Sequence, residues 1–341
     1  MSKLEINQLD LFSGIGGFHL GFERAGYKVN SYFSEIDKHA VAVYKQQFKD
    51  STYVGSVTDV RGGDLPTIDL ITFGSPCQDF SLAGKRKGMG GERSSLILEA
   101  IRLINECRPR AFVWENVKGT FSSNDGEDFA AILQAFANIG GYRLEWQLLN
   151  TSWFLPQNRE RIYLVGYSTT PGGDWRGVFP IGEEPRENTR LSGQQGNACT
   201  LTTRYGADGN GSYVTERKQY AQEIKVKSAT SKGYEVATEG DSINLSQPNS
   251  ETRRGRVGKG KAQTLETSCN QAAVQDYRIR RLTPIECERL QGFPDNHTEY
   301  GNYDGEVKKM SNTQRYKQCG NAVTVDVVQA VAEKLKPIYN A

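Results

Sequence analysis

The feature that most constrains the fold is a regular alternation of short apolar stretches and longer amphipathic stretches up to Tyr167. The short stretches have the length of strands, whereas the longer ones space apolar residues three and four positions apart, as at Phe18, Phe22 and Ala25. Strands are expected at residues 6–12, 29–33, 68–73, 111–114, 144–149 and 162–165, and helices at 18–25, 40–48, 94–107 and 129–139. This alternation predicts an α/β protein with a doubly wound, mostly parallel sheet.

The pattern changes after Tyr167. Residues 168–275 are rich in Gly, Ser, Thr, Asn and Gln, show only short β-like pieces, and hold many of the 36 glycines. Regular structure is expected to resume at Arg280 and to end in an apolar helix at 323–335. We therefore expect a first domain at 1–167, a smaller loop- and β-rich domain at 168–279, and a C-terminal segment at 280–341 whose last helix returns to the first domain.

Composition indicates the class of protein and its cellular compartment but says little about its function. With 37% hydrophobic and 24% charged residues it is an ordinary globular protein, and its formal net charge of +2 neither requires nor excludes a nucleic-acid partner. The six cysteines and three histidines show no zinc-site spacing, so no metal is expected. No apolar run approaches the ~20 residues that span a bilayer, which predicts a cytoplasmic protein without a membrane segment and with reduced thiols.

The first candidate site is the glycine turn at 13–17, which joins an expected strand to an expected helix. Backbone N–H groups and the helix dipole meet a polar ligand at such a turn. Glu35 follows the second strand 21 residues beyond Gly14, where a carboxylate can bind ribose hydroxyls, and Asp59 is suited to an adenine amino group. These residues indicate a nucleoside-containing cofactor, although a tight turn without a ligand remains an alternative.

The second candidate site is the loop after the strand at 68–73, which carries Pro76, Cys77 and Gln78. Ligands bind at the carboxyl ends of strands in such sheets, so a cysteine here is a candidate nucleophile. The basic stretch at 84–88 that follows suits a phosphate backbone. Glu115 ends another strand, and Arg159 and Arg161 precede the strand at 162–165. A structural cysteine and an internal ion pair are the simpler alternatives.

Six motifs, in this order, resemble those of the DNA (cytosine-5-)-methyltransferases of bacterial restriction–modification systems and phages. They are DLFSGIGG at 10–17, PCQ at 76–78, ENV at 115–117, QNRER at 157–161, RLT with RLQGFP at 281–294, and GNAV at 320–323. Six motifs in one order are far more specific than any one of them. Only residues 168–275 lie outside the match, where this family keeps its variable target-recognition domain.

The resemblance implies a Rossmann-like methyltransferase fold and methyl transfer from S-adenosylmethionine to C5 of a flipped-out cytosine, which leaves S-adenosylhomocysteine. Cys77 would attack C6 of the base because C5 alone is a poor nucleophile. Glu115 would protonate N3, Arg161 would hold O2, and Arg159 would orient Glu115 or a phosphate. The implied cofactor contacts are Phe12, Gly14, Gly16, Gly17, Glu35, Ile36, Asp59, Pro76, Leu96, Asn321 and Val323.

The implied partner is double-stranded DNA with a short target site, bound by a monomer. A cognate restriction endonuclease is a second candidate partner, whose existence the sequence leaves open. Expected contacts near the flipped base are Gln78, Ser81, Lys85, Arg86, Lys87 and Thr264. In the recognition domain, the basic run of Arg253, Arg254, Arg256, Lys259 and Lys261 suits phosphates, although an ordinary solvated loop is an equal alternative.

Three other functions can be weighed against this one. An RNA cytosine-5 methyltransferase would use the same chemistry, but the long recognition segment argues against it. A non-catalytic binding module would not require Cys77, Glu115 and Arg161 together. A nicotinamide oxidoreductase explains the glycine turn but neither PCQ at 76–78 nor the paired arginines at 159 and 161.

Overall fold

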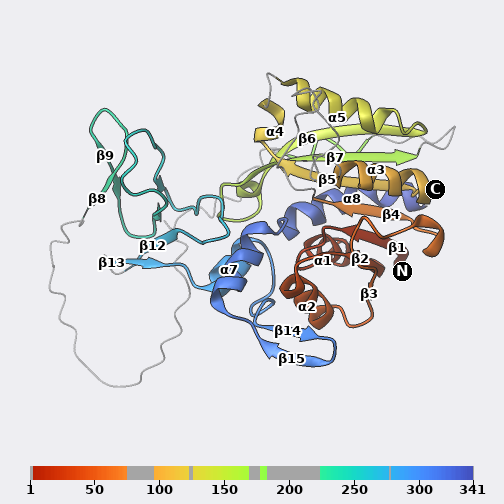
Figure 1. Cartoon of the computed structure of the whole chain (residues 1–341). Helices are drawn as coiled ribbons and strands as arrows, with labels where there is room; N and C mark the ends of the chain where they lie inside the picture. Colours follow the sequence, from red (N-terminus) through yellow and green to blue (C-terminus); the bar gives the residue numbers. More distant parts are fainter. Residues whose placement is uncertain are drawn as a thin grey trace, which may run out of the picture. The chain divides into compact units, whose positions relative to one another are not determined.

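The computed structural model describes residues 3–74, 96–122, 126–168, 177–182, 223–275 and 278–340. The chain forms two compact units (Figure 1). Unit 1 comprises Met1–Glu183, Glu266–Ser268 and Thr283–Ala341, and unit 2 comprises Glu184–Leu265 and Cys269–Leu282.

Unit 1 is built on a seven-stranded sheet in the order β3-β2-β1-β4-β5-β7-β6. The strands are β1 Leu4–Leu11, β2 Tyr27–Ser34, β3 Thr52–Tyr53, β4 Leu70–Phe73, β5 Ala111–Val117, β6 Tyr142–Asn150 and β7 Glu160–Ser168. Neighbours from β3 to β5 are parallel, whereas β7 runs antiparallel to both β5 and β6. The expected doubly wound, mostly parallel sheet is confirmed.

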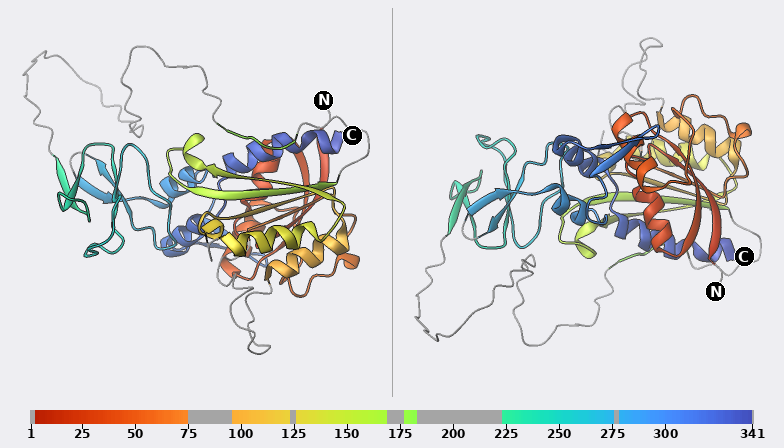
Figure 2. Two further views of the ribbon diagram at one scale, coloured as in Figure 1. Left: turned by 90° about the horizontal axis from the view of Figure 1, so that it is seen from above. Right: turned by 90° about the horizontal axis from the view of Figure 1, so that it is seen from below.

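Helices cover both faces of this sheet (Figure 2). On one face lie α1 (Gly17–Arg24) and α8 (Val325–Asn340), and on the other lie α3 (Leu96–Cys107) and α5 (Glu127–Ala137). Side chains alternate between two apolar cores, so that Leu70 packs with α1 and α8 whereas Ile71 and Phe73 pack with α3 and α5. Helix α8 lies directly on α1, and the hydroxyl of Tyr27 donates to the carbonyl of Ala332 at 2.9 Å.

Several short elements complete unit 1. Helix α2 (Lys38–Gln47) follows Asp37, whose carboxylate accepts the backbone N–H of His39 and so caps the helix. The others are η1 Gly62–Asp64, α4 Gly119–Ser122, η3 Thr151–Trp153, α6 Pro284–Leu290, β14 Tyr300–Tyr303, β15 Glu306–Lys309 and α7 Asn312–Asn321. Ile15 and Val43 share a third core with Phe293 and Val325 from the C-terminal part of the chain.

Unit 2 contains strands of two to five residues. One hairpin pairs β8 (Ile224–Lys227) with β9 (Tyr234–Ala237); a four-stranded sheet has the order β11-β10-β12-β13. Its strands are β10 Ser242–Asn244, β11 Val257–Gly258, β12 Gln271–Gln275 and β13 Arg278–Arg281. These short antiparallel strands are the short β-like pieces expected in this part of the chain, and strands this short leave little periodicity in the sequence.

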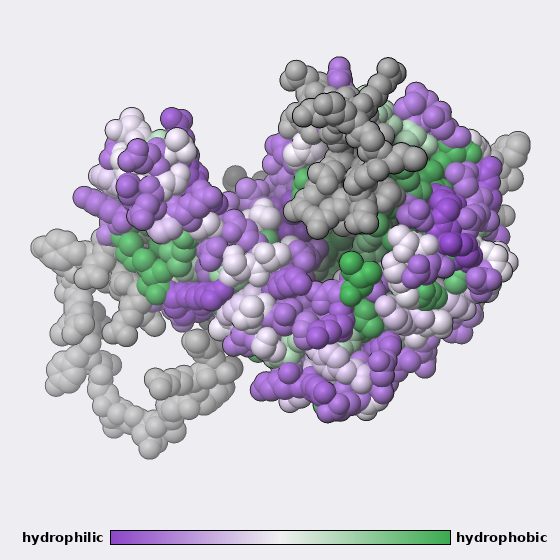
Figure 3. Space-filling view, viewed as in Figure 1, coloured by the Kyte–Doolittle hydropathy of each residue, from purple (hydrophilic) through white to green (hydrophobic). Residues whose placement is uncertain are grey.

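The surface in Figure 3 is mostly hydrophilic, with small, separate apolar areas. None of the helices in the described ranges is both long and apolar enough to cross a membrane. Among the same residues, no group of His, Cys, Asp and Glu side chains could hold a metal ion. Cys107, Cys269, Cys287 and Cys319, the four cysteines that the structure describes, form no disulfide.

Candidate active site

The glycine turn connects β1 to α1 through residues with left-handed backbone. Phe12, Gly14 and Gly16 have φ of 51°, 55° and 84°. A Cβ on Gly14 would meet only open space, whereas one on Gly16 would lie 2.3 Å from the ring of Phe48. Gly16 and Gly17 are therefore needed for close packing, and Gly14 is the glycine of the turn that faces the cavity described below.

Glu35 fixes the turn from the end of β2. Its carboxylate accepts the backbone N–H of Gly14 at 2.9 Å and those of Ile36 and Asp37 at 2.8 Å each. Beside it, Ile36 exposes 82% of its surface. Three backbone donors hold this carboxylate in place, which is a rigid arrangement for meeting a ligand hydroxyl.

Glu115 and Arg161 meet across two neighbouring strands. Glu115 lies in β5, which continues to Val117, and Arg161 lies opposite Val117 in β7. Their side chains are mostly buried, and Arg161 Nε lies 3.1 Å from Glu115 Oε1. A charge-assisted contact of this kind fixes a carboxylate at the carboxyl end of the parallel strands.

Arg159 lies in the cavity wall near Glu115 and is held there by backbone carbonyls. It is buried, and its guanidinium donates to the carbonyls of Gly320 at 3.2 Å and Ala322 at 2.9 Å. Burial, and then the neighbouring Arg161, lowers the pKa of Arg159 to about 10, so that it stays charged at neutral pH. Arg161 is the arginine that pairs with Glu115, whereas Arg159 ties β7 to the end of α7.

These groups surround one cavity of about 480 Å³. Its lining includes nine predicted site residues: Phe12, Gly14, Glu35, Ile36, Leu96, Glu115, Arg159, Arg161 and Asn321. Gly16, Gly17, Asp59 and Val323 are not part of the lining; Val323 instead packs against Gly17. Cys77, Pro76, Gln78, Ser81, Lys85, Arg86 and Lys87 lie outside the described residues.

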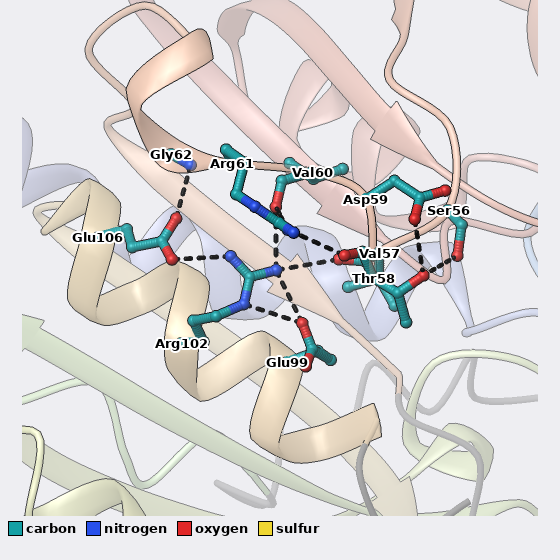
Figure 4. A network of polar contacts seen from close by, with 10 residues as sticks. All are labelled: Ser56, Val57, Thr58, Asp59, Val60, Arg61, Gly62, Glu99, Arg102 and Glu106. Atoms are coloured by element: carbon teal, nitrogen blue, oxygen red, sulfur yellow. Dashed lines mark hydrogen bonds and ion pairs between the residues drawn. The ribbon is translucent and has the colours of Figure 1, made fainter. Parts of the chain in front are cut away.

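Asp59 is exposed and lies in a turn beside the cavity. Ser56 and Val57, at the start of this turn, line the cavity. The turn follows β3 and packs against α3 (Figure 4). The hydroxyl of Thr58 donates to Asp59 Oδ1 at 3.2 Å, which orients the carboxylate.

Gln318 in α7 is a lining residue that the sequence alone did not single out. It exposes only 5% of its surface, and neither its amide nitrogen nor its amide oxygen has a hydrogen-bond partner among the described residues. It precedes Asn321 by three positions on the same helix, and this spacing could have identified it. A buried amide without partners is unfavourable unless a ligand satisfies it.

The C-5 cytosine-specific DNA methylase family matches this chain over residues 6–337. The chain belongs to this family. The resemblance inferred from the ordered motifs is thus confirmed, and the protein is a DNA (cytosine-5-)-methyltransferase.

Several relatives of the methyltransferase are named Type II methyltransferases of bacteria. It is 35% identical over 332 residues to the Type II methyltransferase M1.ScrFI of Lactococcus lactis subsp. cremoris, covering 96% of this chain and 77% of that protein. It is 32% identical over 335 residues to the Type II methyltransferase M.NlaX of Neisseria lactamica, covering 98% and 97%. The S. pombe Dnmt2 methyltransferase shares the fold, with a TM-score of 0.61 and 19% identity over 97% of this chain and 99% of that one.

In unit 2 of the methyltransferase the basic run separates into buried and exposed members. Arg256 is buried, and its guanidinium donates to four backbone carbonyls, those of Lys227, Asn244, Ser246 and Pro248. It holds unit 2 together and does not present its charge to a phosphate, contrary to the expectation. Lys259 is exposed but bonded to Asp241 at 2.6 Å. Arg254 and Lys261 are exposed, and Arg253 and Thr264 are half-buried.

Proposed function

We propose that this methyltransferase transfers a methyl group from S-adenosylmethionine to C5 of a cytosine flipped out of double-stranded DNA, through a covalent bond between Cys77 and C6. The observation that carries the proposal is the Glu115–Arg161 pair, which lies in the wall of the same cavity as the glycine turn and Glu35. The carboxyl group proposed for the base and the glycine turn proposed for the methyl donor thus line the same cavity.

The residues of the cavity fit the proposed donor. Glu35 is available for ribose hydroxyls, the apolar side chains of Ile36 and Leu96 for the adenine ring, and Asn321 and the unpartnered amide of Gln318 for the polar amino-acid end. When bound, S-adenosylmethionine supplies an electrophilic methyl group. The residues around it orient the donor and exclude water from it.

Cys77 would act on the base as a thiolate. Its sulfur forms a bond to C6, and the electrons of the C5–C6 double bond shift toward N3, which takes a proton from Glu115. Arg161 keeps that carboxyl group in place and stabilises the carboxylate left behind. C5 would then take the methyl group from the donor's sulfonium, which leaves as S-adenosylhomocysteine. A base removes the C5 proton, the C5–C6 double bond re-forms, the sulfur leaves as thiolate, and N3 returns its proton to Glu115.

The DNA contacts proposed for the second part of the chain follow from the positive charge of the basic run and, for Thr264, from the resemblance to the family. We propose residues 168–279 as the target-recognition domain, with Arg253, Arg254, Lys259, Lys261 and Thr264 along the DNA. The partner is a duplex with a short target site, bound by a monomeric cytoplasmic enzyme. A companion restriction endonuclease is inferred from the Type II relatives.

The decisive experiment is covalent trapping on duplex DNA that contains 5-fluorocytosine, because fluorine at C5 cannot leave as a proton does. We expect a denaturant-stable adduct that requires S-adenosylmethionine and is lost in Cys77→Ser. Cys107→Ser is the matched control: burial raises the pKa of this half-buried thiol to about 11, and the adduct should persist. An adduct that survives Cys77→Ser would refute the assignment of the nucleophile.

Two further measurements test the substrate and the donor. Methylation of a duplex but not of transfer RNA is expected, and the reverse would favour the RNA enzyme. Calorimetry should show binding of S-adenosylmethionine and none of a nicotinamide dinucleotide. Bisulfite sequencing of plasmid DNA from cells expressing the gene would then identify the target site.

A further inference from the structure

The turn at 56–62 is one wall of the cavity and also carries Asp59. Ser56 and Val57 line the cavity, and Asp59 is the residue proposed for the adenine amino group. Within the turn, the backbone N–H groups of Asp59 and Val60 both donate to the carbonyl of Ser56. The strand before it, β3, has only two residues, so the turn needs support from elsewhere to keep one conformation.

That support comes from Arg102 in α3 (Figure 4). Its guanidinium donates to the carbonyl of Val57 at 3.2 Å and to that of Val60 at 2.9 Å. These two carbonyls lie on either side of Asp59 in the sequence. A single side chain therefore fixes the backbone before and after the residue proposed to contact the ligand.

Two carboxylates on the same face of α3 hold the guanidinium itself. Arg102 Nε donates to Glu99 at 2.9 Å, and Nη1 donates to Glu106 at 2.8 Å. Glu106 also accepts the backbone N–H of Gly62 at 2.7 Å, at the far end of the turn. A Cβ on Gly62 would lie 2.6 Å from that of Glu106, so only glycine allows this approach.

We propose that Arg102 is a positioning residue, which sets the turn so that the Asp59 carboxylate receives the adenine amino group of the donor. The inference rests on the proposed function. Lysine cannot replace it, because only the planar guanidinium directs donors to two carboxylates and two carbonyls together. Glu99 and Arg102 pair three positions apart on one helix, and an ion pair of this kind contributes little to global stability. Loss of Arg102 should therefore affect ligand selectivity more than folding.

The test compares two ligands, S-adenosylhomocysteine and its analogue with hypoxanthine in place of adenine, which lacks the amino group. Calorimetry should show that the wild type prefers the adenine ligand and that Arg102→Lys weakens this ligand about tenfold, as expected for one lost hydrogen bond to a charged group. The affinity for the hypoxanthine ligand should change much less. The preference of Arg102→Lys for the adenine ligand should therefore approach the smaller preference of Asp59→Ala. The kcat of Arg102→Lys at saturating donor should stay near the wild-type value.

A purely structural role would give a different result. Glu106→Gln keeps the size of the side chain and should reproduce a smaller loss of preference, and Arg143→Lys, which removes an exposed arginine contact on β6, should leave both ligands unchanged. If Arg102→Lys weakens both ligands equally, the proposal is overturned while the proposed function stands. If the wild type binds neither ligand, the proposed function falls, and this inference falls with it.

Discussion

The buried His297 should make the stability of the protein depend on pH, and the magnitude of this effect can be worked out from its pKa. The imidazole exposes 4% of its surface, and its Nε2 lies 2.9 Å from the carbonyl of Ile15 in the glycine turn. The rings of Phe293 and Phe48 lie against it. Burial lowers the pKa of His297 from 6.5 to about 4, because a charged imidazole would lose its water here. The hydrogen bond to Ile15 and the charge of Glu288 raise this pKa but only partly compensate.

The direction of the pH effect follows from that lowered pKa. Between pH 6.5 and 4 the unfolded chain binds more protons at this site than the folded chain, so stability present above pH 6.5 is lost as the pH falls. One pKa unit corresponds to about 1.4 kcal/mol, so the loss from this site is about 2 kcal/mol at pH 5 and about 3 kcal/mol below pH 4. Above pH 7 the site should contribute no pH dependence.

The assay is urea unfolding at pH 7.5 and pH 5 of the wild type and His297→Gln, whose amide can still donate to Ile15. The free energy of unfolding should fall by about 2 kcal/mol more in the wild type than in the variant. Equal pH dependence in the wild type and His297→Gln would refute the reasoning.

Two further predictions concern packing and the cavity. Gly16→Ala should lower the free energy of unfolding by about 2 kcal/mol, because the new Cβ combines a φ of 84° with a clash against Phe48, whereas Gly63→Ala, in open space, should be nearly neutral in the same urea titration. Gln318→Met should leave the stability of the ligand-free protein unchanged or raise it by about 1 kcal/mol, yet weaken S-adenosylhomocysteine about tenfold in calorimetry. Destabilisation of the ligand-free protein by Gln318→Met would show that the amide has a structural partner.

Much of unit 1 could be predicted because its signals are local. Each expected strand is present, and Asp37 caps α2 as a short acidic residue before a helix should. The glycine turn and Glu35 were predicted from spacing alone, since a strand, a turn and a second strand bring them to one edge of a parallel sheet.

The side-chain roles that could not be predicted depend on burial and on contacts made only in the folded chain. Arg256 belongs to a basic run, yet its guanidinium satisfies backbone carbonyls inside unit 2, and no count of charges distinguishes it from Arg254 on the surface. Asp59 was predicted as a contact of the adenine amino group, but its position in a turn held by α3 could not be predicted. Both outcomes follow from contacts between residues far apart in the sequence.

The contact between Glu115 and Arg161 depends on the direction of β7 and not only on its position in the sheet. Residues that begin a parallel strand lie at the amino edge of the sheet, a full strand length from residues that end its neighbour. Because β7 runs antiparallel to β5, its beginning lies beside the end of β5, and Val117 pairs with Arg161. The motif at 157–161 can therefore reach Glu115 only through this reversal, which short alternating apolar stretches do not encode. Inserting one antiparallel strand into an otherwise parallel sheet is what brings the carboxylate and its arginine to the same edge as the glycine turn.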